Sequence, residues 1–252
     1  MLKNEVALIT GGARGIGYAI AEKYAKNGAT VIINAVHEES ADKAVSALRE
    51  KGYKAYPCVF DVTDRDHLFD AVKKVTQITG DITILVNNAG ISPKKDGKPV
   101  AVVDMDFEEW QHVMDVNLNG MFNCAQAVLP SMLKAASGKI INISSASARV
   151  YTDFTSSHYI TSKTAIIGFT HALAGELALK GIQCNCIAPG RCWTDMTRRL
   201  PLEANNAIAE TILTKRLGET EEVANVALFL AAKGTEYMTG TTIDINGGYF
   251  MS

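Results

Sequence analysis

Short runs of apolar, β-branched residues alternate along the chain with longer segments in which apolar residues recur every three or four positions. The short runs predict seven strands, at 5–10, 29–35, 54–60, 82–90, 138–144, 182–188 and 241–247. The longer segments predict helices over 16–28, 39–52, 64–79, 105–136, 157–180 and 195–232. Several strands are apolar at nearly every position, which indicates a sheet that helices cover on both faces.

The alternation of strands and helices predicts repeated βαβ units, and right-handed crossovers then produce a doubly wound parallel sheet. The expected fold class is therefore α/β, with seven parallel strands and helices on both faces. No linker-like, low-complexity or repeated segment interrupts the 252 residues. We therefore expect a single domain over 1–252.

Composition excludes some classes of function. The net charge is −2, so no global basic field indicates nucleic acid or an anionic membrane as a partner. No apolar run approaches the roughly 18 residues of a membrane span, and the N-terminus lacks a signal-peptide pattern, so a cytoplasmic location is expected. The five cysteines contain no C-x-x-C pair, and Cys184 and Cys186 share one face of a predicted strand. We interpret these two as buried thiols and expect no metal site.

A glycine-rich segment, "TGGARGIG" at 10–17, directly follows the first predicted strand and opens the first helix. Gly11 permits a tight turn, Gly15 lets the backbone approach a pyrophosphate, and Gly17 allows the helix and strand to pack closely. The helix N-terminus supplies free N–H groups and a partial positive charge. In this context the segment predicts a dinucleotide-binding turn.

Tyr159 and Lys163 lie four residues apart on a predicted helix and therefore share one face. A nearby ammonium favours the phenolate and lowers the tyrosine pKa from its usual value near ~10. The pair can thus act as a general acid and base near physiological pH. His158 points about 100° away and is interpreted as structural or rim-lining. A serine hydrolase is not expected, because the chain has no G-x-S-x-G elbow.

Three further segments support one resemblance: "NNAG" at 87–90, "NISSAS" at 142–147 and "APG" at 188–190. With the glycine turn and the Tyr159/Lys163 pair, they resemble the short-chain dehydrogenase/reductase family, in the expected order and over nearly the whole chain. The resemblance implies a Rossmann-like fold and hydride transfer between a nicotinamide and a carbonyl or secondary alcohol. It also implies a substrate lid over about 193–214 and assembly as a homotetramer or dimer.

The resemblance also implies the roles of individual residues. Tyr159 exchanges a proton with the substrate oxygen, while Lys163 lowers the Tyr159 pKa and holds the nicotinamide ribose. Asn117 supports a proton relay through water. Ser145 hydrogen-bonds the substrate oxygen, with Ser147 as the alternative.

The expected cofactor is NADP(H), with NAD(H) as the alternative. An acidic residue at the end of the second strand would bind the ribose diol and repel a 2′-phosphate, but that position is Ala35. Arg14 can pair with a 2′-phosphate, and Asn34 and His37 can add hydrogen bonds. The resemblance implies further cofactor contacts from Ile16, Asp61, Val62, Asn87, Ala89, Gly90, Tyr159, Lys163, Pro189, Gly190 and Thr194.

The substrate is less sharply defined. The chain is similar to 3-oxoacyl-[acyl-carrier-protein] reductases, but Ala136 and Lys180 occupy the positions of that group's carrier-docking arginines. A sugar, polyol or hydroxysteroid dehydrogenase is therefore the alternative. A catalytically silent dinucleotide-binding scaffold or sensor is a remote alternative, because the four catalytic residue types are all present.

The loop after the fourth predicted strand and the predicted lid both carry residues that could contact a substrate. Lys94, Lys95 and Lys98 follow the fourth strand, where they either steer anionic substrates or are simply solvated. The predicted lid combines apolar residues with two arginines: Trp193, Met196, Leu200, Ile208, Arg198 and Arg199.

Overall fold

The computed structural model describes residues 1–198 and 201–251. Within this part of the chain, all strand pairs of the main sheet are parallel, in the order β3-β2-β1-β4-β5-β6-β7. The strands are β1 (Val6–Ile9), β2 (Thr30–Ala35), β3 (Ala55–Val59), β4 (Ile84–Asn87), β5 (Gly138–Ile143), β6 (Ile182–Pro189) and β7 (Thr242–Ile245). The predicted doubly wound, seven-stranded sheet is confirmed.

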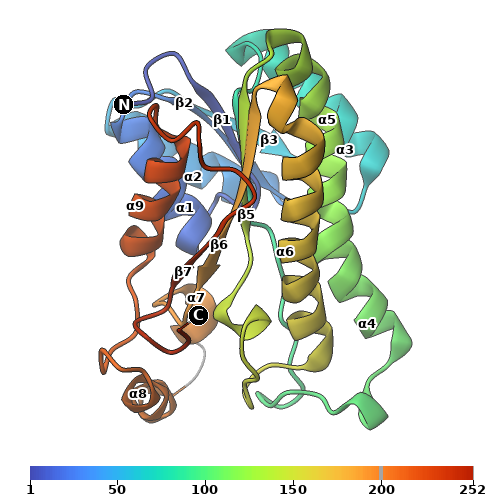
Figure 1. Ribbon diagram of the computed structural model, residues 1–252, viewed down its shortest axis with the longest axis vertical. Coiled ribbons are helices and arrows are strands. Elements are labelled where there is room, and N and C mark those ends of the chain that lie inside the picture. Colours follow the sequence, from blue (N-terminus) through green and yellow to red (C-terminus); the bar gives the residue numbers. More distant parts are fainter. Residues whose placement is uncertain (199–200, 252) are drawn as a thin grey trace.

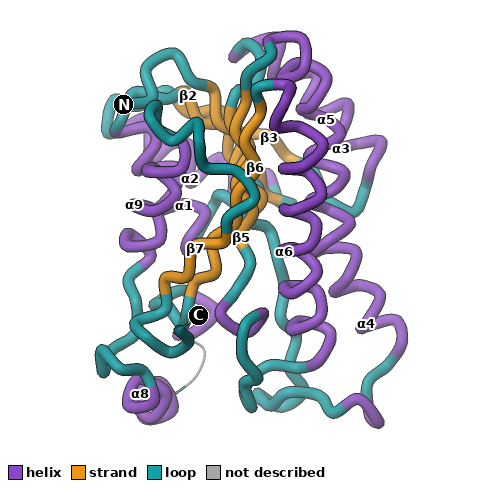
Figure 2. The backbone as a smooth tube through the Cα atoms, in the orientation of Figure 1, coloured by secondary structure: helices purple, strands orange, loops and turns teal. Residues whose placement is uncertain are grey.

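Helices cover both faces of the sheet, as Figures 1 and 2 show. One layer contains α1 (Gly15–Lys26), α2 (Glu38–Glu50) and α9 (Thr220–Ala231). The other contains α3 (Arg65–Thr79), α5 (Gly120–Ala135) and α6 (Ser157–Leu177). The remaining helices are α4 (Phe107–Met114), α7 (Asp195–Arg198) and α8 (Leu202–Thr211), with short 3₁₀ turns at Val102–Asp104, Ala146–Ala148 and Ala178–Lys180.

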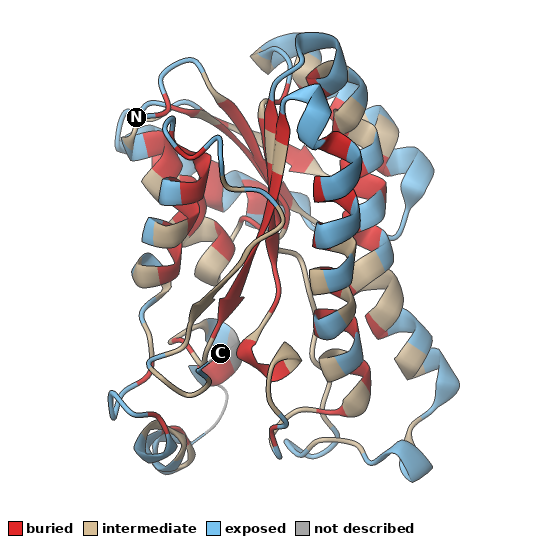
Figure 3. Ribbon diagram, in the orientation of Figure 1, coloured by how far each residue is buried: buried red, intermediate tan, exposed pale blue. Residues whose placement is uncertain are grey.

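The central strands are buried on both faces (Figure 3). Along β1, Ala7 and Ile9 pack in the layer of α1 and α9, while Val6 and Leu8 pack in the layer of α3 and α5. This division follows from the two-residue period of a strand, and it explains why β1 is apolar throughout.

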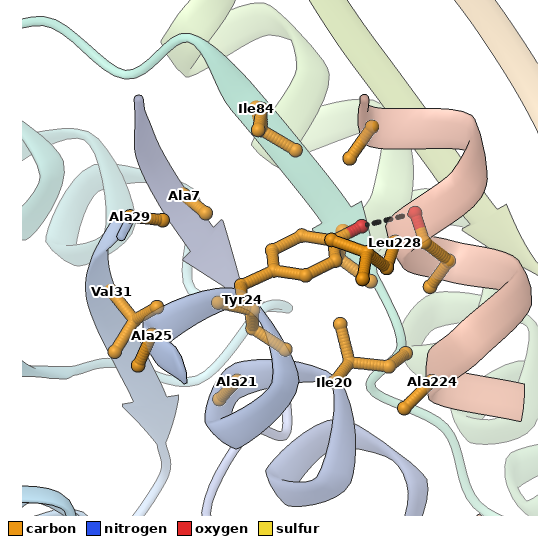
Figure 4. Close-up of a cluster of buried hydrophobic side chains, with 14 of the residues drawn as sticks. Ala7, Ile20, Ala21, Tyr24, Ala25, Ala29, Val31, Ile84, Ala224 and Leu228 are labelled. Atoms are coloured by element: carbon orange, nitrogen blue, oxygen red, sulfur yellow. Dashed lines mark hydrogen bonds between the residues drawn. The ribbon is translucent and has the colours of Figure 1, made fainter. Parts of the chain in front are cut away.

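Tyr24 joins two helices in the first layer (Figure 4). It is fully buried, and its hydroxyl donates a 2.8 Å hydrogen bond to the carbonyl oxygen of Ala227 on α9. A buried phenol needs such a partner, so this bond offsets the cost of removing the hydroxyl from water. The ring thereby fixes α1 against α9.

Two predicted helices are interrupted. The segment 105–136 contains α4, a π-helical turn at Asp115–Asn119 and then α5. The backbone stays helical through the π turn, so the apolar pattern does not reveal it. The segment 195–232 contains α7, α8 and α9 as separate helices. Pro201 caps the start of α8, and Gly218 lies in the connection to α9, so turn-forming residues accompany these breaks.

All five cysteines are free and buried, and Cys184 and Cys186 both lie in the interior on β6. The interpretation of this pair as buried thiols is confirmed. Among the described residues, no helix is both long and apolar enough to cross a membrane.

Candidate active site

The chain adds strands to one side of β1 first and then to the other: β1 pairs with β2 on one side and with β4 on the other. The strand order therefore reverses between β1 and β4. In open α/β sheets, ligands bind outside the carboxyl ends of the strands at such a switch point. The glycine turn follows β1, and the segment 87–90 begins in the last residue of β4. The two motifs therefore meet where a dinucleotide is expected.

The glycine turn has a backbone that other residues would not adopt readily. Gly11 and Gly15 have φ angles of +59° and +55°. A Cβ atom on Gly17 would lie 2.4 Å from the Gly11 carbonyl oxygen and 2.6 Å from Nδ2 of Asn88. The first turn of α1 therefore lies directly against the glycine turn, which leaves its N–H groups at the switch point.

Two residues that the sequence analysis did not select hold this turn in place. The Thr10 hydroxyl accepts hydrogen bonds from the N–H groups of Asn88 (2.9 Å) and Ala89 (3.0 Å). The Asn88 amide donates to the carbonyl oxygens of Thr10 (2.9 Å) and Gly11 (3.1 Å). Thr10 and Asn88 therefore join the ends of β1 and β4. The sequence feature that could have identified them is a polar residue directly after each strand.

The prediction that Asn34 hydrogen-bonds a 2′-phosphate requires a correction. Its amide group donates to the carbonyl oxygens of Cys58 (3.2 Å) and Phe60 (2.9 Å), and its Oδ1 accepts from the Gly11 N–H at 3.2 Å. Both amide protons are used and the side chain is buried, so none is left for a 2′-phosphate. Asn34 instead ties the glycine turn to β2 and β3.

The predicted cofactor contact of Asn87 also requires a correction. It is completely buried, and its amide donates to Oδ1 of Asn142 on β5 at 2.9 Å. The Asn142 amide continues the chain of hydrogen bonds to the hydroxyl of Thr170 on α6, at 3.0 Å. The Asn87 side chain therefore lies inside the protein and does not line the surface where a cofactor would bind.

The other predicted cofactor residues lie around the same edge. Arg14 and His37 are exposed, directly before α1 and α2. The Asp61 carboxylate accepts from the N–H and hydroxyl of Thr63, at 2.9 and 2.8 Å. Val62 is buried against Gly120, where a Cβ would lie 2.6 Å from its Cγ2.

The end of β6 approaches the glycine turn. A Cβ on Gly15 would lie 3.6 Å from Cγ2 of Thr194, an ordinary van der Waals contact. Pro189 is the last residue of β6, and the Gly190 N–H donates to the Ile245 carbonyl oxygen at 2.8 Å. Ile16 is half-buried and packs against the core of the first layer.

Three elements bring the proposed catalytic groups together. Lys163 on α6 donates from Nζ to the Ile143 carbonyl oxygen at 2.9 Å and lies 5.8 Å from the centroid of the Tyr159 ring. A Cβ on Gly90, after β4, would lie 3.3 Å from this Nζ and 3.2 Å from Oδ1 of Asn117. The Tyr159/Lys163 pair, Asn117 and Gly90 are thus neighbours in space.

Asn117 sits in the π-helical turn between α4 and α5. Its Oδ1 accepts from the Ile91 N–H at 2.8 Å, and its Nδ2 donates to the Ile91 carbonyl oxygen and the Ser162 hydroxyl, both at 3.0 Å. The π turn therefore presents a buried amide that fixes the segment after β4 against α6. Such turns are frequent at functional sites.

The three serines after β5 have distinct surroundings. The buried Ser144 hydroxyl donates to the Lys163 carbonyl oxygen at 2.6 Å, so it holds the backbone of α6. The Ser145 side chain hydrogen-bonds the Tyr159 phenol and also accepts from the Ser147 N–H at 3.1 Å. This arrangement favours Ser145 over Ser147 as the partner of the substrate oxygen.

The pKa of Tyr159 differs from the sequence-based expectation. Burial raises it, and the hydrogen bond with Ser145 only partly offsets the rise. The Lys163 ammonium donates to the Ile143 carbonyl oxygen and is itself desolvated. Burial lowers the pKa of Lys163 to about 8. Tyr159 therefore holds its proton at neutral pH, as a proton donor must.

His158 is structural, as its position on the helix predicted. It is fully buried, and its Nε2 lies 3.0 Å from Oε1 of Glu109 on α4. The contact fixes α6 against α4 beside the site.

Comparison with known proteins agrees with this geometry. A family model described as "Enoyl-(Acyl carrier protein) reductase" matches residues 11–250. The 3-oxoacyl-[acyl-carrier-protein] reductase FabG of Thermotoga maritima is 42% identical over 98% of each chain. The chain belongs to the short-chain dehydrogenase/reductase family. Members of this family are oxidoreductases that bind a nicotinamide dinucleotide.

Two solved short-chain dehydrogenase/reductase structures show the same fold with different nucleotides. A 3-oxoacyl-[acyl-carrier protein] reductase from Brucella melitensis with bound NAD has a TM-score of 0.93 and 39% identity, covering 99% of this chain and 92% of its own. A gluconate 5-dehydrogenase from Burkholderia cenocepacia, in complex with NADP and tartrate, has a TM-score of 0.92 and 33% identity, covering 98% and 96%.

The region that the short-chain dehydrogenase/reductase resemblance predicts as the lid contains α7 and α8. Asn205 on α8 donates to the Thr197 carbonyl oxygen at 3.0 Å, which joins the two helices. Trp193 lies before α7, with the Arg198 guanidinium 5.8 Å from its ring. Ile208 is half-buried. The Met196 side chain and residues Arg199 and Leu200 lie outside the described part.

The lysines of the loop after β4 divide into two groups. The backbones of Lys95 and Lys98 bond each other at 2.9 and 3.0 Å in a tight turn, and both side chains are exposed. Lys94 is half-buried, and its pKa is lowered by burial and by the positive charge of Arg191. Arg191 directly follows the "APG" segment, and the sequence analysis did not select it.

The lowered pKa of Lys163 predicts a change of stability with pH. The folded protein releases this proton near pH 8, whereas the unfolded chain retains it to about 10.5. Between these values the unfolded state binds more protons, so the free energy of unfolding rises with pH. Relative to Lys163→Met, the unmodified protein is expected to gain up to roughly 3 kcal/mol from pH 8 to 10.5. Urea unfolding of both proteins measures this gain, and a constant difference would contradict it.

Proposed function

We propose that this protein is an NADP(H)-dependent oxidoreductase that transfers a hydride between the nicotinamide and a carbonyl or secondary alcohol. The observation that carries the proposal is the arrangement of Tyr159, hydrogen-bonded to Ser145 and adjacent to Lys163, at the carboxyl edge of a sheet whose switch point holds a glycine turn. The bound nicotinamide would supply the hydride chemistry.

The residues of the chain would bind and orient the reactants and move the proton. The Tyr159 hydroxyl donates its proton to the substrate oxygen in reduction, and its raised pKa keeps the phenol protonated at neutral pH. Ser145 orients the same oxygen. The Lys163 ammonium holds ribose hydroxyls, and Asn117 keeps the segment after β4 beside it.

The nucleotide preference rests on the end of β2 and on the glycine turn. Ala35 stands where an acidic side chain would repel a 2′-phosphate, and Arg14 is exposed in the turn. Since Asn34 is used inside the fold, Arg14 and His37 remain as the groups for the phosphate.

Arg14→Ala is therefore expected to lower the NADPH/NADH ratio of kcat/KM by about 10- to 100-fold, because a charged hydrogen-bond donor to the phosphate is lost. Steady-state rates with both nucleotides measure the ratio. Lys26→Ala, an exposed change in the last turn of α1, is the matched control. An unchanged ratio in Arg14→Ala would remove Arg14 from the phosphate site.

The first substrate to test is a 3-oxoacyl thioester, because the curated relative from Thermotoga maritima is named a 3-oxoacyl-[acyl-carrier-protein] reductase. One observation favours a second candidate, a sugar or polyol. Ala136 directly follows α5 and Lys180 ends the 3₁₀ turn before β6, so both lie at the amino edge of the sheet. Within one protomer, a carrier docked there would lie at the opposite edge from Tyr159.

The deciding experiment measures NADPH and NADH oxidation with acetoacetyl thioesters, keto sugars, diketones and oxo-steroids. Turnover of at least one carbonyl compound, with dependence on Tyr159, supports the proposed reaction. Binding of NADPH without any turnover would instead indicate a silent dinucleotide-binding protein.

The organisation of the chain is part of the proposal. We regard 1–252 as one domain with its lid over about 193–214, assembled as a homotetramer or dimer. Phe122 and Leu133 on α5 are partly exposed, and the Phe122 ring lies 6.4 Å from that of Phe169 on α6. This apolar face is suited to contact a second copy, and the cytoplasmic location stays a prediction.

A further inference from the structure

Two cationic side chains, those of Lys94 and Arg191, are close enough for the charge of one to lower the pKa of the other. Lys94 follows β4 and Arg191 follows β6, and these two strands flank β5 in the sheet. The carboxyl end of β5 therefore lies between the two strands, and Arg191 contacts the ring of Phe154, five residues before Tyr159 in the chain. Ser145 lies at that end, next to Tyr159.

The guanidinium of Arg191 is held in place rather than free in solution. Its Nε and Nη2 donate to Oδ1 of Asn205 on α8, at 3.2 and 3.1 Å. The Phe154 ring lies 5.5 Å away, and the Tyr249 ring is tilted by 47° against Phe154, with 6.5 Å between the ring centroids. Burial lowers the pKa of Arg191, and its charge in turn lowers that of Lys94.

Neither cation is neutralised by the protein. Among residues 1–198 and 201–251, no carboxylate forms an ion pair with Arg191 or Lys94. Asp153 adjoins Phe154 but is exposed, and Arg149, on the same segment, pairs with Asp244 instead. Two partly desolvated, like charges repel each other, and an anion placed between them would offset that cost.

We propose that Arg191 and Lys94 bind a carboxylate of the substrate, at the side of its carbonyl group away from the nicotinamide. The inference rests on the proposed hydride transfer at Tyr159 and narrows the substrate class to oxo acids or hydroxy acids. Asn205 occupies the Nε/Nη2 edge of the guanidinium, so the Nη1/Nη2 end supplies the planar donor pair that suits a carboxylate, and the ammonium supplies a second charge. The Phe154 ring covers one face of the guanidinium, and the Tyr249 ring packs against Phe154.

The test uses pairs of substrates that differ only in this charge: acetoacetate and levulinate, each against its methyl ester. The acids are expected to have the higher kcat/KM with NADPH. Lys94→Gln, which removes a charge but no side-chain hydrogen bond within the described part of the chain, should lower kcat/KM for the acids by about 10-fold or more and leave kcat/KM for the esters unchanged. Arg191→Gln should lower kcat/KM for the acids by about 10- to 100-fold.

Controls separate the subsite from the fold and from the reaction. Lys95→Gln changes the neighbouring exposed lysine and should leave both members of each pair unchanged. Arg191→Lys keeps the charge but loses the fork, so it should recover part of the preference for acids. Because Arg191 also holds α8, thermal melting of each variant accompanies the kinetics.

Each outcome bears on one proposal. Equal rates for acids and esters, or equal losses for both in Lys94→Gln and Arg191→Gln, would overturn the anion subsite and leave the oxidoreductase intact. Turnover restricted to phosphorylated carbonyl compounds would replace the carboxylate by a phosphate. No turnover of any carbonyl compound, charged or neutral, would count against the proposed reaction itself.

Discussion

Replacing Tyr159 with Phe is expected to lower kcat for carbonyl reduction by about 10²- to 10⁴-fold. The phenol is the group that donates the proton, and Phe keeps the ring that packs beside Lys163. Affinity for NADPH, measured by fluorescence titration, should change little, because Lys163 and the glycine turn are untouched. Single-turnover rates with a saturating carbonyl substrate measure the loss.

The raised pKa of Tyr159 predicts that carbonyl reduction and alcohol oxidation depend differently on pH. Reduction uses the protonated phenol, which predominates at neutral pH, whereas oxidation of an alcohol uses the phenolate. The rate of oxidation should therefore rise as the pH is raised above neutrality, while the reduction rate should not. Retention of most reductase activity in Tyr159→Phe would show that another group is the proton donor.

Replacing Gly17 with Ala is expected to abolish tight nucleotide binding and to destabilise the protein by about 1–3 kcal/mol. The new methyl group would lie 2.4 Å from the Gly11 carbonyl oxygen and 2.6 Å from the Asn88 amide, so the glycine turn must move. Both contacts are with groups that join β1 to β4, and the site has little freedom to adjust.

Gly168→Ala is the matched control. Gly168 lies inside α6, is exposed, and would place its methyl group in open space. Because Ala favours a helix, this change should leave nucleotide binding intact and raise stability by about 0.5–1 kcal/mol. Isothermal titration with NADPH and thermal melting compare the two variants. Equal behaviour of both would mean that the packing at Gly17 is unimportant.

The strands and the order of the motifs could be predicted because each depends on local pattern. Runs such as "VALI" in β1 are apolar on both faces, and that pattern corresponds directly to a covered parallel sheet. The glycines at 11 and 15 likewise occupy positive φ positions, a requirement that is visible in the sequence as glycine itself.

The side chains whose roles the sequence did not predict correctly depend on long-range contacts. Asn34 and Asn87 are polar residues within the last two positions of their strands, and such residues suggest a ligand site. Each is instead buried by partners far away in the chain, at Cys58, Phe60 and Asn142. Arg191 was missed for the opposite reason, since its role depends on Lys94, which lies almost a hundred residues earlier in the chain.

The π-helical turn at Asp115–Asn119 has a consequence for how such a site can arise. A turn of this kind holds about one residue more than an α-helical turn, and the helices before and after it remain regular. A single inserted codon is therefore the smallest genetic change that converts one form into the other. Because the π turn accommodates the extra residue, the side chains of α5 keep their places while those within the turn are shifted, so a buried amide such as that of Asn117 could reach Ile91 and Ser162 in one step, without new connections in the fold.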